Sequence, residues 1–169
     1  CICHGTGGVL LQHNKELQIH SDIRDKDKVF YFTTCGWMMW NWLVGALSAG
    51  ATILLFDGFP MYKKDDLLFE FASEEKATLL GISAKYIDSL MNKEVVPKKN
   101  YDLSSLRTIC STGSPLSKDG FKYIYNKIKK DVHLSSISGG TDIISCFVLG
   151  NLFQPVYEGE IQNRGLGMD

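Results

Sequence analysis

The chain has 169 residues, of which 44% are hydrophobic and 22% charged, a composition typical of a globular protein with one core. Its net charge of -1 and its pI near 6.5 argue against a nucleic-acid-binding face. The five cysteines are an odd number, and no signal peptide precedes them, which favours free thiols and a cytoplasmic (cytosolic) location. Because the sequence opens at Cys1 and stops within "GLGMD", we expect it to be an internal fragment of a longer protein.

The first third of the chain predicts a helix followed by a strand, a helix and a strand. The first helix should run from Gly8 to about His20, and the next strand from Val29 to Thr33. Residues 29–56 carry no charge and are long enough to span a bilayer, but glycines and polar side chains interrupt them. They fit better as a strand, a Trp-rich helix and a second strand, all buried in a parallel sheet. We therefore expect no stable membrane insertion.

The same alternation continues through most of the chain. Further helices are expected near residues 65–76, 84–91 and 118–128, and further strands near residues 78–83, 106–112 and 132–138. Short apolar strands that alternate with helices predict an α/β fold, with a largely parallel sheet and helices on both faces. The alternation stops near Leu152. We therefore predict an α/β portion over residues 1–151, and the start of a small β subdomain of the same domain over 152–169.

Four polar loops should meet at one edge of this sheet. In parallel sheets, ligands bind at the carboxyl ends of the strands, where the sequence places "TTCGWMM", "GISAKY", "STGSPL" and "SISGGTD". Locally, "STGSPL" fits either a tight turn before a helix capped by Ser117 or a flat platform for a planar base. "GGTD" fits either a plain turn or a close approach to a ligand that needs a hydroxyl and a metal-binding carboxylate. Together the loops predict a site for a nucleotide or another polar ligand.

Two other clusters carry weaker signals. The Trp- and Met-rich run after residue 36 has the composition of a helix core, but Trp37 to Met39 stand where a strand passes into a helix. An apolar pocket at that junction would suit a small acyl chain. In "CICH", Cys1, Cys3 and His4 have no second ligand pair at a suitable spacing, so a zinc site is not favoured.

Three blocks of sequence resemble the acyl-activating adenylate-forming superfamily of acyl-CoA synthetases, luciferases and peptide-synthetase adenylation domains. The blocks are "TTCGWMMWNWLVGALSAGATILLFDGFP", "STGSPLS" and "SISGGTDIISCFVLGNLFQPVYEGEIQ". More narrowly, the chain looks like the members that use acetoacetate. The resemblance implies a ligase in which a carboxylate attacks the α-phosphate of Mg2+-bound ATP, and coenzyme A then displaces AMP. Metal and oriented donors would neutralise the two anions.

The resemblance also implies a role for each matching residue. Thr141 would contact phosphate, and Asp142, a position often Glu in relatives, would hold Mg2+. The residues matched to ATP or AMP are Gly113, Ser114, Pro115, Ser136, Ile137, Ser138, Gly140 and Thr141, with Ser136 standing where many relatives have Asp or Asn. The residues matched to the acyl pocket are Trp37, Met38, Met39, Thr112 and Gly139.

Gly139 is the residue implied to discriminate among acids. Acetate-using relatives place a Trp there, so glycine should leave room for acetoacetate, and Gly139→Trp should reduce acetoacetate use more than acetate use. The alternatives are a synthetase for another short acid, such as acetate or propionate, and a non-catalytic nucleotide-binding paralogue. The expected partners are acetoacetate, ATP and coenzyme A, with no nucleic acid; the sequence does not define an oligomeric state.

Several parts of the superfamily's active site have no counterpart in these residues. The phosphate loop, the ribose-binding Asp, the hinge and the C-terminal domain with its adenylation Lys are all expected outside the chain. We therefore predict that the piece alone is inactive.

Overall fold

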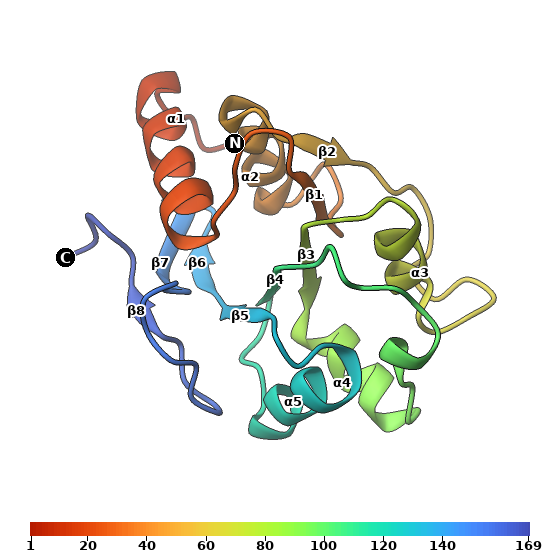
Figure 1. Ribbon diagram of the computed structural model, residues 1–169. Coiled ribbons are helices and arrows are strands. Elements are labelled where there is room, and N and C mark those ends of the chain that lie inside the picture. Colours follow the sequence, from red (N-terminus) through yellow and green to blue (C-terminus); the bar gives the residue numbers. More distant parts are fainter.

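The computed structural model describes all 169 residues, which form a parallel sheet with helices on both faces and a smaller antiparallel sheet beside it (Figure 1). The predicted α/β fold is thereby confirmed. The parallel sheet has the order β2-β1-β3-β4-β5, with β1 at Lys28–Tyr31, β2 at Thr52–Leu54, β3 at Leu79–Ser83, β4 at Thr108–Thr112 and β5 at His133–Ser136. The second sheet has the order β6-β7-β8, with β6 at Ser138–Gly140, β7 at Ser145–Leu149 and β8 at Asn163–Arg164.

The helices lie between the strands, as the sequence predicts. Their bounds are Thr6–Asn14 for α1, Met38–Gly45 for α2, Leu67–Glu74 for α3, Ala84–Asn92 for α4 and Lys118–Tyr123 for α5. Wider helical turns extend α1 through Lys15–His20 and α5 through Ile124–Ile128, and tighter turns follow α2 at Ala46–Ala49 and form Pro97–Lys99. None of the helices is both long enough and apolar enough to cross a membrane.

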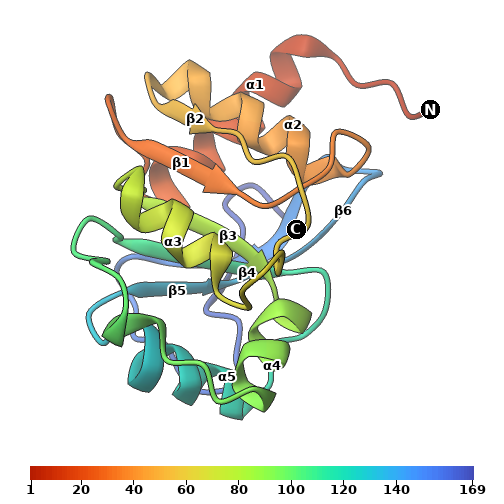
Figure 2. The same cartoon turned by 90° about the vertical axis from the view of Figure 1, so that its right-hand side faces the viewer.

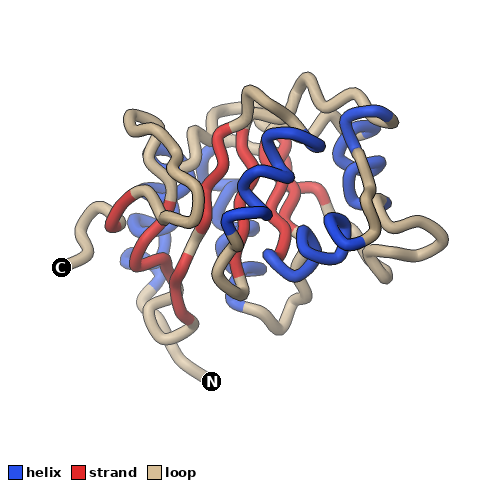
Figure 3. Tube along the Cα trace, turned by 90° about the horizontal axis from the view of Figure 1, so that it is seen from below, coloured by secondary structure: helices blue, strands red, loops and turns tan.

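The parallel sheet separates two apolar layers. Along β1, Phe30 faces the layer formed with α3, α4 and α5, whereas Val29 and Tyr31 face the layer formed with α1, α2 and β7. This alternation follows from the two-residue period of a strand that is buried on both faces. Figure 2 shows α1 and α2 on one side of the strands and α4 and α5 on the other, and Figure 3 shows helices in front of and behind them.

The antiparallel sheet begins earlier than the sequence pattern suggests. The sequence predicts a strand over residues 132–138 that passes directly into a loop, but β5 ends at Ser136 and Ser138–Gly140 form a separate strand, β6, which pairs with β7. Two glycines and a serine give no apolar alternation, so only the pairing with β7 makes this segment a strand. The predicted division between residues 151 and 152 falls between β7 and β8, and the small sheet takes strands from both sides of it.

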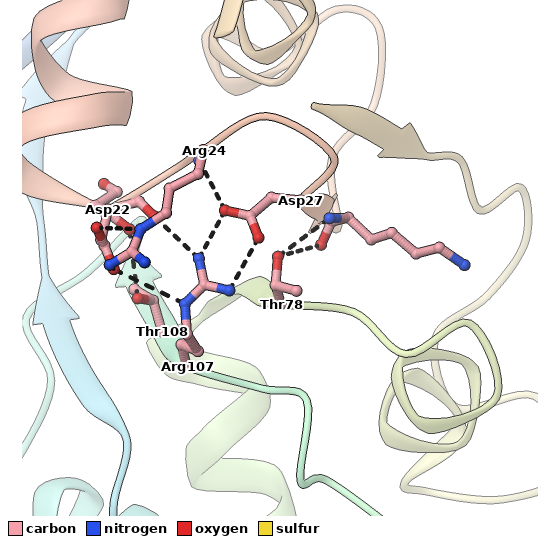
Figure 4. A network of polar contacts seen from close by, with 8 residues as sticks. Asp22, Arg24, Asp27, Thr78, Arg107 and Thr108 are labelled. Atoms are coloured by element: carbon pink, nitrogen blue, oxygen red, sulfur yellow. Dashed lines mark hydrogen bonds and ion pairs between the residues drawn. The ribbon is translucent and has the colours of Figure 1, made fainter. Parts of the chain in front are cut away.

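A polar network fixes the amino ends of the central strands (Figure 4). Arg107, just before β4, donates from Nη1 to Asp27 Oδ1 over 2.9 Å and from Nη2 to Asp27 Oδ2 over 2.6 Å. The backbone N–H of Arg24 donates to the same carboxylate over 2.7 Å. Burial opposes ionisation of Asp27, but these hydrogen bonds outweigh it and hold the pKa of Asp27 below its usual value. The loops that follow the strands lie at the opposite edge of the sheet, where the carboxyl ends of the strands are.

Candidate active site

A cavity of about 520 Å³ opens at the carboxyl ends of β4 and β5 and reaches the start of α2. The cavity brings together every site residue predicted from the sequence except Asp142. Those lining residues are Trp37, Met38, Met39, Thr112, Gly113, Ser114, Pro115, Ser136, Ile137, Ser138, Gly139, Gly140 and Thr141. Three stretches that lie far apart in the chain thus form one site, at the edge where parallel sheets bind ligands.

The "STGSPL" stretch is both a turn and a wall of the cavity. Gly113 follows β4 with a φ of +87°, a left-handed conformation that glycine adopts without strain. Ser117 caps α5, because its side-chain oxygen accepts from the N–H of Gly120 over 3.1 Å, as predicted. Gly113 and Pro115 are exposed to the cavity between these two points. The two sequence interpretations of this stretch are therefore compatible.

The end of β5 is tied to the end of β4 before the chain turns into β6. Ile137 donates its N–H to Ser111 O over 2.8 Å, and Thr112 Oγ1 donates to Ile137 O over 3.2 Å. Ser136 is 6% exposed and lines the cavity beside them. These contacts hold one wall of the cavity through backbone groups that the parallel sheet already positions.

Thr141 and Asp142 stand at the rim of the cavity. Both are exposed in the turn between β6 and β7, but only Thr141 lines the cavity. The Asp142 carboxylate makes no hydrogen bond or ion pair within the chain, and no cluster of three or more His, Cys, Asp or Glu side chains could hold a metal ion. A single free carboxylate fits Mg2+, which usually takes one or two protein carboxylates and completes its shell with water and phosphate oxygens.

The apolar end of the cavity lies between α2 and β7. Met38 and Met39 are buried at the start of α2, Trp37 is partly buried before them, and Cys146 of β7 forms the facing wall. Burial raises the pKa of the Cys146 thiol well above its usual value, and the nearby Glu16 carboxylate acts in the same direction. Cys146 is thus a neutral, compact wall residue.

Gly139 contributes to the cavity through the absence of a side chain. A Cβ at this position would lie 2.2 Å from Ser145 O and 2.8 Å from Cys146 Cα. Any side chain at residue 139 must therefore displace the backbone of β7. Gly139→Trp would change the path of β7 as well as the length of the pocket, and its effect on acid use would combine the two changes.

Six further residues line the cavity without having been predicted, namely Leu116, Phe121, Cys146, Gly159, Glu160 and Ile161. Phe121 lies on α5 and packs in the hydrophobic core as well. Residues 159–161 reach the cavity because the connection between β7 and β8 folds back, and nothing in their local pattern signals this. Glu160 is the one charged side chain in the lining, and no Lys or Arg lines the cavity.

The fold and the cavity place the chain among α/β proteins that bind a ligand at the carboxyl edge of a parallel sheet. More specifically, the chain belongs to the AMP-binding enzyme family, whose model matches residues 6–160. The resemblance to adenylate-forming enzymes is thereby confirmed.

Individual relatives agree with the family match. The chain is 55% identical to acetoacetyl-coenzyme A synthetase of Rhizobium meliloti (strain 1021), over 99% of this chain and 26% of the relative. It is 48% identical to acetoacetyl-CoA synthetase of Gallus gallus, over 99% of this chain and 25% of the relative. The solved structure of an acetoacetyl-CoA synthetase from Streptomyces lividans superimposes with a TM-score of 0.91 at 41% identity, covering 95% of this chain and 25% of that one. The chain thus spans about a quarter of the length of these relatives.

Proposed function

We propose that the protein containing this chain is an acid–thiol ligase that activates acetoacetate with ATP and transfers it to coenzyme A, releasing AMP and pyrophosphate. The observation that carries the proposal is the division of one cavity into two chemically different ends. Hydroxyls and backbone groups line the end near β4 and β5, and Trp37, Met38, Met39 and Cys146 line the other. A nucleotide and a small acid can therefore lie side by side. The relatives' printed names point to the same acid.

The residues divide the chemistry by position. Gly113, Ser114 and Pro115 would lie along the adenine ring, with Ser136 beside them. Thr141 at the rim would donate its hydroxyl to the α-phosphate, where a carboxylate oxygen of the acid bonds to phosphorus as the bond to pyrophosphate breaks. Asp142 would hold Mg2+, which neutralises phosphate charge when bound. In the second half-reaction the thiol of coenzyme A forms the thioester, and AMP leaves.

The setting that we propose is the cytosol. All five cysteines are free thiols, the state that a reducing compartment maintains. There the thioester would carry ketone-body carbon into lipid and fatty acid metabolism.

Pyrophosphate release by the full-length protein tests the proposal. The protein is assayed with Mg2+ and ATP against acetoacetate, acetate, propionate and butyrate, with and without coenzyme A. We expect acetoacetate to give the highest kcat/KM, and both AMP and acetoacetyl-CoA to form when coenzyme A is present. A higher kcat/KM for acetate or propionate would show that this acid, rather than acetoacetate, is the substrate. ATP binding without pyrophosphate release from any acid would show a non-catalytic nucleotide-binding protein.

A further inference from the structure

A buried carboxylate stands directly behind the apolar end of the cavity. Glu16, in the turns that extend α1, is 0% exposed. Its Oε1 accepts from Cys146 N over 2.9 Å, from Gln12 Nε2 over 2.9 Å and from the hydroxyl of Ser145. Its Oε2 accepts from Trp42 Nε1 over 3.0 Å. Nothing in the sequence pattern singled out this residue.

The surroundings of Glu16 indicate a role beyond filling the core. Burying an acidic side chain is costly unless donors satisfy it, and an apolar residue of similar volume often stabilises a fold as well or better. Here the partners are neutral N–H and O–H groups, since no Lys, Arg or His forms an ion pair with Glu16. Three of these partners belong to the two elements that flank the apolar end of the cavity, Trp42 to α2 and Ser145 and Cys146 to β7.

Each carboxylate oxygen of Glu16 accepts hydrogen bonds from one of the two elements, Oε1 from β7 and Oε2 from α2. Through Oε1, Glu16 holds Ser145 and Cys146 of β7, and Cys146 lines the cavity. The Ser145–Cys146 backbone is also the surface against which Gly139 packs. Through Oε2, Glu16 holds Trp42, one helical turn after Met38 on α2. A single buried carboxylate therefore joins α2 to β7 through hydrogen bonds.

We propose that Glu16 is a positioning residue that sets the separation of α2 and β7 and thereby the acid that the cavity accepts. The inference rests on the proposed function, because it names the determinant of acid choice at that site. It concerns the acid rather than ATP. The nucleotide wall is held by contacts among Ser111, Thr112 and Ile137, none of which involves Glu16.

Glu16→Gln in the full-length protein is the direct test. The amide keeps the size of the side chain but replaces one accepting oxygen with an NH2 group, which must face either the Trp42 N–H or the donors of β7. We expect the KM for acetoacetate to rise by about tenfold or more, the scale of a pocket change near one methylene. The preference for acetoacetate over acetate and propionate should shrink, while the KM for ATP stays within about twofold.

A matched control separates positioning from general stability. Asp27 is likewise a buried, hydrogen-bonded carboxylate, but it lies at the opposite edge of the sheet. Asp27→Asn should lower the Tm and leave the KM for both substrates unchanged. Ser145→Ala removes one donor and keeps the carboxylate, so it should shift the KM for acetoacetate in the same direction as Glu16→Gln, by less.

The outcomes are distinct. A Glu16→Gln protein with a lower Tm and an unchanged KM for the acid, or with the KM for acid and ATP raised equally, overturns the inference. If Glu16→Gln does not fold, Ser145→Ala decides, and an unchanged KM for the acid overturns it. Wild-type protein that uses another short acid refutes acetoacetate as the substrate but leaves Glu16 testable on that acid. Wild-type protein that uses no acid refutes both proposals.

Discussion

Two glycines of the cavity are required for different physical reasons. Gly113 has a φ of +87°, and the nearest atom to a Cβ built there is Ser83 Cβ, 4.0 Å away. Gly139 has no such backbone constraint, but a Cβ there would lie 2.2 Å from Ser145 O. Residue 113 must adopt a left-handed backbone conformation, whereas residue 139 must leave room for the backbone of β7.

Substitution by alanine and by asparagine should separate these two requirements. Gly113→Ala should cost about 1–2 kcal/mol, and Gly113→Asn less, because Asn tolerates the left-handed region. Gly139→Ala should cost about 1–3 kcal/mol through overpacking, and Gly139→Asn more, because it adds volume. Urea unfolding of the full-length variants measures each difference. Asn ranking better than Ala at residue 139 would contradict the steric explanation.

At the scale of elements, β5 is attached to the chain before β8 through His133. Its Nε2 pairs with Gln162 Oε1 at 3.0 Å, whereas its Nδ1 is buried without a partner. Burial lowers the pKa of His133, and the hydrogen bond to Gln162 opposes this only in part. Protonation would place a second N–H in a site that has no acceptor for it.

This arrangement predicts a loss of stability in mild acid. At high pH His133 is neutral in both the folded and unfolded states, so it adds no pH dependence. Below about pH 6.5 the unfolded chain takes up the proton first, so the free energy of unfolding falls until the lower folded-state pKa is passed. Chemical unfolding between pH 8 and 5 measures the slope, and His133→Gln should reduce it. An equal slope in that variant would assign the effect to other groups.

The elements differ in how far the sequence could predict them. The parallel strands and their helices were predictable because apolar residues repeat with the period of each element, and Ser117 was predictable as a cap from its place before a helix. β6 and β8 were not, because they contain three and two residues, and their pairing with β7 alone defines them. The helix predicted from Gly8 to about His20 covers the turns of Lys15–His20, but the pattern gives no sign that they are wider than α-helical turns or that Glu16 is buried there.

The candidate site shows the same distinction. Its predicted residues were implied by the family resemblance, and they lie in or beside the loops that the strand-end argument had indicated independently. Cys146 and Glu160 reach the cavity through the antiparallel pairing and a returning loop, and both depend on contacts distant in sequence. Asp142 was predicted from its motif and stands just outside the lining, at the rim.

At the scale of the whole molecule, the cavity lacks positive charge. Glu160 is the one charged side chain that lines it, so nothing in the lining offsets the phosphates of ATP. We therefore expect the isolated 169-residue piece to show no ATP–pyrophosphate exchange with acetoacetate, while the full-length protein does. Measured exchange by the purified piece, with a catalytically dead full-length preparation as background, would contradict this expectation.

The amino-terminal and carboxyl-terminal edges of the parallel sheet differ in role. Asp27 and Arg107 join strand beginnings at one edge, and the cavity occupies the other. Substitutions that alter acid choice tend to destabilise a fold, and a protein tolerates them only while it stays above a stability threshold. Because the two edges share no residues, a gain in stability at the strand beginnings can offset such losses without disturbing bound ligand. Under the proposed function, this separation would let acid preference change while the strand beginnings keep the fold stable.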